Sequence, residues 1–187
     1  MMSTTHAAMG LAAASILTVV APELAVVAGL AAVAGGVFPD LDLVLQHRKS
    51  LHHPELYPVL AALAAVPALL RPGPLLVAVA WFFGGAALHS LTDVLGGGLG
   101  LRPWESDDER GIYLHTRARW VPPRRWVRYD GAPEDLLVAV AFSIPPYLAF
   151  GPQVRKLILA GLGASLGYVL LRKRLVDVYE RFAGCSE

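Results

Sequence analysis

The stretch of residues 74–93 reads PLLVAVAWFFGGAALHSLTD. Its first fifteen residues carry no charge, and its whole length is about the 20 residues that a helix needs to cross a bilayer. The stretch ends on His89 and Asp93, which are four residues apart and therefore share one helix face. It predicts a membrane-spanning helix with a polar, ion-binding end.

Composition extends this prediction to the whole chain. Of the 187 residues, 55% are hydrophobic and 17% are charged, and the mean hydropathy is +0.51. Soluble domains hold about 45–50% apolar and about 25% charged residues. The apolar residues form six segments, with the charges between them, at 5–20, 23–38, 55–70, 73–95, 133–150 and 155–182. We therefore predict an all-α, polytopic membrane bundle of short helices, folded as a single domain over 1–187.

The first two apolar segments are short for a membrane span. Segments 5–20 and 23–38 have 16 residues each and are separated by Pro22, whereas a crossing needs roughly 20 residues. Both a tilted crossing and a buried hairpin are compatible with these lengths.

Basic residues fall unevenly on the two sides that six crossings would create. The N-terminus, the loops 39–54 and 96–132 and the C-terminal tail would share one side, which holds thirteen of the sixteen Lys and Arg residues. Basic loops tend to remain in the cytoplasm. We therefore expect a multi-pass protein of the cell (inner or plasma) membrane, with its N-terminus and long loops in the cytoplasm.

The loop 96–132 interleaves arginines with tryptophan, tyrosine and proline. Next to a membrane, this mixture is typical of anchoring to anionic lipid. The arginines expected to contact anionic phospholipid headgroups are Arg117, Arg119, Arg124, Arg125 and Arg128. Alternatively, the loop covers a functional site, selects an anionic substrate and contributes His115.

Two further features narrow the partners and the chemistry. The net charge of +1 gives no reason to expect a nucleic-acid partner. The single cysteine, Cys185, excludes an intramolecular disulfide.

Small residues at Gly84 and Gly85, and at Gly163 and Gly167, have the spacing of helix-packing faces. The sequence leaves the oligomeric state open.

Potential metal ligands gather at the same predicted side. They come from four stretches, THAAMG, FPDLD, HRKSLHH and HSLTD. Each stretch alone has an ordinary structural explanation, such as a His–Asp pair at a helix end or a solvated loop. Together they bring imidazoles and carboxylates to one end of one bundle, a donor set that suits zinc, manganese or iron. We expect one or two divalent ions there, most simply zinc.

The ordered motifs THAAMG, GGVFPDLD, HRKSLHH and GAALHSLTDVLGGGLGLRPW resemble those of the YdjM-type family of membrane-bound, metal-dependent hydrolases. The resemblance covers residues 4–104, and that family is distantly similar to the helical zinc-dependent phospholipases C. It implies that the metal ligands are His6, Asp40, His52, His89 and Asp93. The family's loop usually reads Thr-His-Ser where this chain has Leu51-His52-His53, so either histidine is a candidate ligand. Residues 105–187 match no motif.

The resemblance and the donor set together imply hydrolysis of a phosphoester or lipid-linked substrate at the cytoplasmic face. Asp42 is our candidate to accept a proton from the attacking water. Arg48 is our candidate to stabilise charge on the substrate, with anchoring to a lipid headgroup as the alternative. Possible additional ligands are His47, His53 and His115. A metal transporter and a non-catalytic membrane scaffold are the rival functions.

Overall fold

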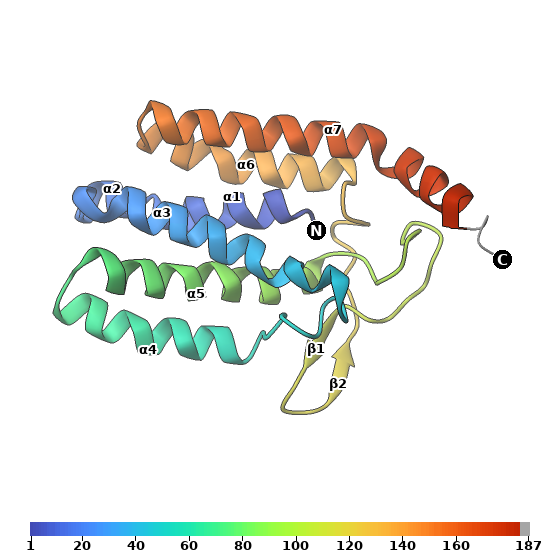
Figure 1. Ribbon diagram of the computed structural model, residues 1–187, viewed down its shortest axis with the longest axis horizontal. Helices are drawn as coiled ribbons and strands as arrows, with labels where there is room; N and C mark the ends of the chain where they lie inside the picture. The colour runs from blue at the N-terminus through green and yellow to red at the C-terminus, as the bar shows by residue number, and fades with distance from the viewer. Residues whose placement is uncertain (184–187) are drawn as a thin grey trace.

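A computed structural model describes residues 1–183, and it confirms the all-α prediction apart from one short hairpin. Cys185 lies outside the described residues. The helices run side by side, and the long loops collect at one end of the bundle together with the N-terminus (Figure 1). The helical elements are α1 (Ser3–Ala14), α2 (Leu17–Val20), α3 (Pro22–Val37), η1 (Phe38–Val44), α4 (Leu56–Leu70), α5 (Pro74–Thr92), η2 (Asp93–Leu95), α6 (Pro133–Ala149) and α7 (Pro152–Ala183).

Proline sets where four of these helices begin. Pro22, Pro74, Pro133 and Pro152 are the first residues of α3, α5, α6 and α7. A proline is tolerated at this position because its missing N–H would have no partner in the helix, and its fixed φ suits the first turn. The predicted segment boundaries are therefore close to the observed ones.

The predicted segment 5–20 is two helices instead of one. The Ser15 hydroxyl donates to the Ala12 carbonyl at 2.6 Å, and the Thr18 hydroxyl donates to the Ser15 carbonyl at 2.7 Å. Such side-chain bonds compete with the backbone ladder. The chain turns at Ser15 and Ile16, and α2 follows.

Four stretches are long and apolar enough to cross a membrane. They are Ser3–Val20, Pro22–Val44, Pro74–Leu95 and Pro152–Phe182. The shorter apolar helix α4 has 15 residues, which is about 23 Å of helix at 1.5 Å per residue. The 17 residues of α6 are also fewer than a usual span.

Glycines allow α3 and α5 to approach each other closely. A Cβ added at Gly35 would lie 1.9 Å from the Phe82 carbonyl oxygen, and one added at Gly85 would lie 2.2 Å from that of Ala32. The predicted packing role is thus confirmed for Gly85. It is wrong for Gly84, Gly163 and Gly167 within the described chain, because an added Cβ at these positions meets nothing within 4 Å.

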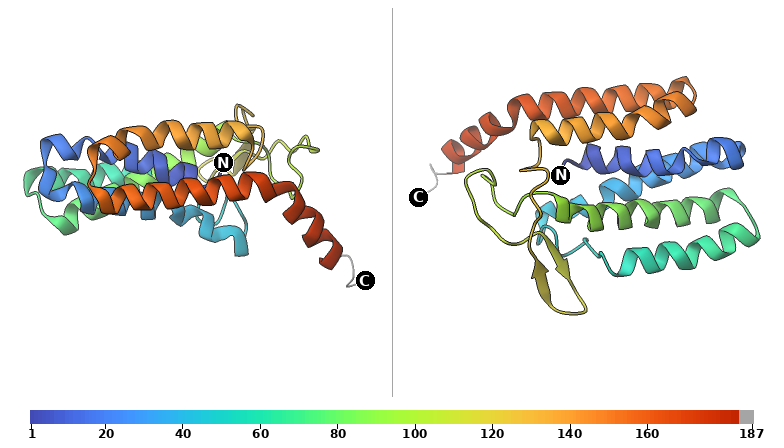
Figure 2. Two further views of the ribbon diagram at one scale, coloured as in Figure 1. Left: turned by 90° about the horizontal axis from the view of Figure 1, so that it is seen from above. Right: turned by 180° about the vertical axis from the view of Figure 1, so that it is seen from behind.

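Within residues 1–183, the basic loop contains the one departure from an all-α fold, a hairpin of β1 (Ile112–Leu114) and β2 (Arg119–Val121). The strands pair antiparallel, with Ile112 opposite Val121. After the hairpin the chain returns to the end of α5, where the backbone N–H groups of Arg124 and Val127 donate to the carbonyls of Val94 and Leu95. The loop is therefore docked against the loop end of the bundle, whereas the last turns of α7 project beyond it (Figure 2).

Candidate metal centre

The structure brings all five predicted ligands together at the loop end of the bundle. His6 is on α1, Asp40 is in η1, His52 is in the loop before α4, and His89 and Asp93 are at the α5–η2 junction. His52, His89 and Asp93 are each at most 1% exposed. Five residues that are distant in sequence therefore share one enclosed site.

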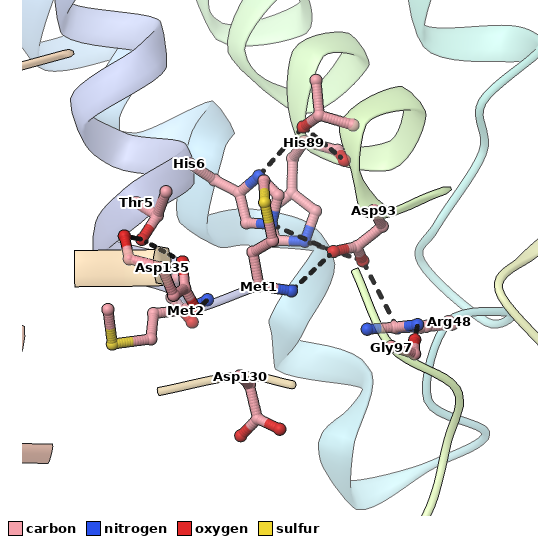
Figure 3. Close-up of polar contacts among 12 residues, drawn as sticks. Met1, Met2, Thr5, His6, Arg48, His89, Asp93, Gly97, Asp130 and Asp135 are labelled. Atoms are coloured by element: carbon pink, nitrogen blue, oxygen red, sulfur yellow. Dashed lines mark hydrogen bonds and ion pairs between the residues drawn. The ribbon is translucent and has the colours of Figure 1, made fainter. Parts of the chain in front are cut away.

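The histidine Nε2 atoms converge on the carboxylates. His6 Nε2 lies 3.0 Å from Asp93 Oδ1, and His52 Nε2 lies 3.3 Å from Asp93 Oδ2. His89 Nε2 lies 3.3 Å from Asp40 Oδ1 and 3.6 Å from Asp93 Oδ2. The rings of His6 and His89 stack with their centroids 3.8 Å apart, and Asp93 faces them (Figure 3).

Each of these imidazoles is held by its other nitrogen. His89 Nδ1 donates to the Gly36 carbonyl at 2.6 Å, and His52 Nδ1 donates to Asp42 Oδ2 at 2.9 Å. His6 Nδ1 lies 3.2 Å from Thr92 Oγ1, whose own proton goes to the Leu88 carbonyl. The Nδ1 atoms of His52 and His89 are bonded to acceptors, so in the neutral rings their Nε2 atoms present lone pairs to the centre, as in metal-binding histidines. His6 does the same in the tautomer that carries its proton on Nδ1.

This arrangement fits a divalent cation. When the three rings are neutral, their Nε2 lone pairs face two carboxylates at distances of 3.0–3.7 Å. Asp93 is also paired with the N-terminal ammonium of Met1 at 3.1 Å and lies 3.6 Å from Arg48 Nε, so the imidazole nitrogens are the acceptors that a cation would satisfy. Buried charges and lone pairs are costly unless they are paired or coordinate a metal. Nitrogen and oxygen donors without thiolate match zinc, manganese or iron.

A second group of potential ligands adjoins the first. His6, His89 and Asp93 form one group whose donor atoms lie within 4.8 Å of one another, and Asp40, His47 and His52 form the other. His52 Nε2 lies 3.7 Å from Asp40 Oδ1 and 3.1 Å from His89 Nε2, so the two groups are contiguous. The donor set therefore suits either one ion or two neighbouring ions.

Asp42 lies behind the ligands and not among them. Its carboxylate accepts hydrogen bonds from His47 Nδ1 and His52 Nδ1, each at 2.9 Å, and from the backbone N–H of Leu51 at 3.1 Å. These three donors favour a role in orienting the two histidines over the proton-accepting role that the sequence suggested. A carboxylate behind a ligating histidine is the usual second partner in metal sites.

Arg48 is enclosed within the site. It is 5% exposed, and its Nη1 donates to the carbonyls of Gly97 at 2.6 Å and Gly111 at 3.3 Å. Its Nε lies 3.6 Å from Asp93 Oδ2 and has no hydrogen-bond partner among the described residues. These contacts disfavour the alternative of a lipid-headgroup anchor. They leave an N–H donor available beside the ligands.

His53 and His115, the other possible ligands, pair with each other away from the centre. Their rings stack with centroids 4.2 Å apart. His53 Nε2 bonds the Ser50 carbonyl at 3.2 Å, and His115 Nε2 bonds the Lys49 carbonyl at 3.0 Å. Neither belongs to a group of potential metal ligands in the described chain. Of the two neighbouring histidines, the structure therefore brings His52 to the site.

At His52, in the loop before α4, hydrogen bonding and burial have opposite effects on the pKa. Burial disfavours the charged imidazole, but hydrogen bonds to Asp42 and Asp93 outweigh it and raise the pKa of His52 above its ordinary value. At His53, burial and the neighbouring His115 act together and lower the pKa. The two adjacent histidines thus have opposite electrostatic environments.

Sequence reasoning missed the residues that support α1, which carries His6. Asp135 on α6 is fully buried and accepts from the Met2 N–H at 2.8 Å, the Thr5 hydroxyl at 2.7 Å and the Gly131 N–H at 3.0 Å. Ser3 donates to Asp40. Asp135 was interpretable only as a helix-start acid, because nothing in the sequence indicates that its partner is the first turn of α1.

A cavity of about 630 Å³ opens beside the ligands. Asp40, His47, Arg48 and Asp93 line one wall, and Tyr168 and Arg172 of α7 line another. Arg172 is paired with Asp130 at 2.9 Å, and that carboxylate also accepts from the Tyr168 hydroxyl. Asp40 and Asp93 are therefore reachable from a space large enough for a substrate headgroup.

The arginines predicted to contact lipid differ in their surroundings. Arg117, Arg119 and Arg124 are exposed, and so is the neighbouring Trp126. Arg125 pairs with Glu109, and Arg128 pairs with Glu134. For the exposed arginines, contact with lipid headgroups stays a prediction. The paired arginines have a structural role in the loop.

Comparison of the chain with protein-family models, curated proteins and solved structures finds no match.

Proposed function

We propose that this protein is a membrane-bound, metal-dependent hydrolase acting on a phosphoester or lipid-linked substrate at the cytoplasmic face. The observation that carries the proposal is the convergence of the Nε2 atoms of His6, His52 and His89 on Asp40 and Asp93, with every Nδ1 bonded behind. Such a pre-oriented donor set at the wall of a cavity is what a catalytic metal site requires.

The bundle's surface supports placement in a membrane. Large apolar side chains are exposed along the helices, among them Val19, Leu69, Leu75 and Leu148, each more than 70% exposed. An apolar exterior of this extent is unfavourable in water and suits lipid. The candidate site lies at one end of the helices, and this end carries most of the basic residues, so we place it at the depth of the cytoplasmic headgroups.

Each residue of the site has a role in the proposed reaction. A divalent ion held by these ligands would supply Lewis acidity and make water a nucleophile near neutral pH. Asp42 fixes the ring orientation and tautomer of His52 and His47. Arg48 lines the cavity beside Asp93, and its guanidinium would supply positive charge to stabilise a phosphoryl group bound there.

Activity of the purified protein tests the proposal. The full chain in detergent, supplied with zinc or manganese, is expected to hydrolyse bis(p-nitrophenyl) phosphate or a phospholipid in mixed micelles, and EDTA is expected to abolish turnover reversibly. The His89→Ala, Asp93→Ala double variant should be inactive, and His53→Ala should remain active. Absence of turnover on every phosphoester, with metal bound, would instead favour the scaffold or transport alternative.

A further inference from the structure

A second cavity lies between α1, α3, α6 and α7, and its lining is apolar. Its volume is about 300 Å³. The apolar side chains that form its walls include Ala8, Leu11, Val33, Leu157, Ile158 and Leu162. The lining contains no charged residue, so the proposed reaction gives this space no role. Its walls suit a hydrocarbon ligand.

The second cavity adjoins the first. Ser3, Thr4 and Ser165 line both. The Ser165 hydroxyl donates to the Gly161 carbonyl at 2.8 Å and lies 2.7 Å from Thr4 Oγ1, from which it can accept. Ser3 donates to the candidate ligand Asp40. The lining therefore changes from metal ligands, through three hydroxyls, to aliphatic side chains. This order of surroundings matches the headgroup, the linkage region and the chain of a lipid.

Leu43, which lines the first cavity, belongs to a run of exposed apolar side chains. Leu43 of η1 lines that cavity and is 67% exposed, and the next residue, Val44, is 87% exposed. Leu41 and Leu45 are exposed beside them. Unpaired leucines at the loop end are unfavourable in water, but they suit contact with a bilayer surface from which a lipid could enter.

We propose that the second cavity binds the hydrocarbon chain of a lipid whose phosphate-bearing head occupies the first cavity. This inference rests on the proposed function for the role of the head, and it adds that the substrate is an amphipathic lipid with one chain held inside the protein. A volume of about 300 Å³ is at the lower end of the roughly 300–1,000 Å³ of ligand pockets. It therefore favours a single chain.

Two glycines of α7 provide a matched pair of variants. An added Cβ meets nothing within 4 Å at either Gly161 or Gly163, so neither Gly161→Leu nor Gly163→Leu forces a backbone clash. Only Gly161 lines the second cavity. A leucine at 161 would occupy part of that cavity, and a leucine at 163 would not.

Photo-crosslinking tests the inference without requiring turnover. The probe is a lysophosphatidic acid with a diazirine midway along its acyl chain, added to the full-length protein in detergent, and labelled peptides are identified by mass spectrometry. We expect labelling of α1 and α7 at the cavity walls, at least fivefold less labelling in Gly161→Leu, and parental labelling in Gly163→Leu. Unlabelled lysophosphatidic acid should compete, whereas glycerol 3-phosphate at the same concentration should not.

Two outcomes would overturn the inference. One is labelling spread evenly over exposed helix faces such as Leu69 and Leu75. The other is equal labelling of Gly161→Leu and the parent when both melt at the same temperature. Failure of the hydrolase proposal is distinguishable from both, since specific labelling without turnover would establish lipid binding at this cavity and refute only the catalytic role.

Discussion

His52 Nε2 and His89 Nε2 lie 3.1 Å apart, although one residue is in a loop and the other is on α5. Both Nδ1 atoms donate to oxygen acceptors, Asp42 for His52 and the Gly36 carbonyl for His89. Two neutral imidazoles held this way would direct lone pairs at each other, which is unfavourable unless a proton or a cation lies between or beside them. The geometry of this contact therefore indicates that the site is arranged to hold a positive charge.

Asp42→Asn should weaken metal binding while preserving the fold. The amide cannot accept from His47, His52 and Leu51 as the carboxylate does, so the ligands lose their fixed orientation. Loss of such a partner typically costs about 10- to 100-fold in metal affinity. Competition titration with a chromophoric zinc chelator measures the change. If Asp42→Asn binds metal as tightly as the parent but loses turnover, Asp42 instead accepts a proton in the reaction.

Arg48→Lys should lower turnover and leave metal content unchanged. Lysine keeps a positive charge near Asp93 but lacks the guanidinium that donates to Gly97 and Gly111. Removing one preorganised donor to a developing negative charge costs about 10²-fold in kcat. The control is Lys49→Gln, since Lys49 lies over the Tyr113 ring and not at the ligands. Equal turnover in Arg48→Lys and the parent would remove Arg48 from the proposed mechanism.

The sequence predicted the ligands better than it predicted their supports. Helical periodicity links His89 with Asp93, and the predicted crossings bring imidazoles and carboxylates to one end. The choice of His6, Asp40 and His52 as their co-ligands was implied by the resemblance to the YdjM-type family. Asp135 and Arg172 act through partners more than 40 residues away. No local pattern encodes such partners. The hairpin at 112–121 was hidden because its strands have three residues each.

Asp135→Asn should destabilise the protein more than its neighbour Glu134→Gln does. Asp135 is buried and anchors Met2 and Thr5 of the segment that carries His6, and leaving buried donors unsatisfied costs about 1–3 kcal/mol. Glu134 forms a partly exposed ion pair with Arg128, worth roughly 0–1 kcal/mol. Thermal unfolding in detergent, with and without zinc, compares the two. Equal melting temperatures would contradict the anchoring role.

Gly85→Ala should destabilise the bundle, and Gly84→Ala should not. The new methyl at 85 would lie 2.2 Å from the Ala32 carbonyl oxygen, whereas at 84 it would meet nothing within 4 Å. Forcing α3 and α5 apart is an overpacking defect of about 1–3 kcal/mol or more. The displacement should also weaken zinc binding, because α5 carries His89. Similar unfolding of the two variants would show that these helices pack differently.

The metal content of the detergent-purified protein tests whether the converging histidines and carboxylates bind a metal. Elemental analysis of the parent, of the His89→Ala, Asp93→Ala double variant and of His53→Ala would be made after equal exposure to zinc and manganese. The account predicts one or two equivalents of zinc or manganese in the parent and in His53→Ala, and loss of the metal from a double variant that still elutes as a folded protein. Absence of bound metal from the parent, even after reconstitution, would contradict it.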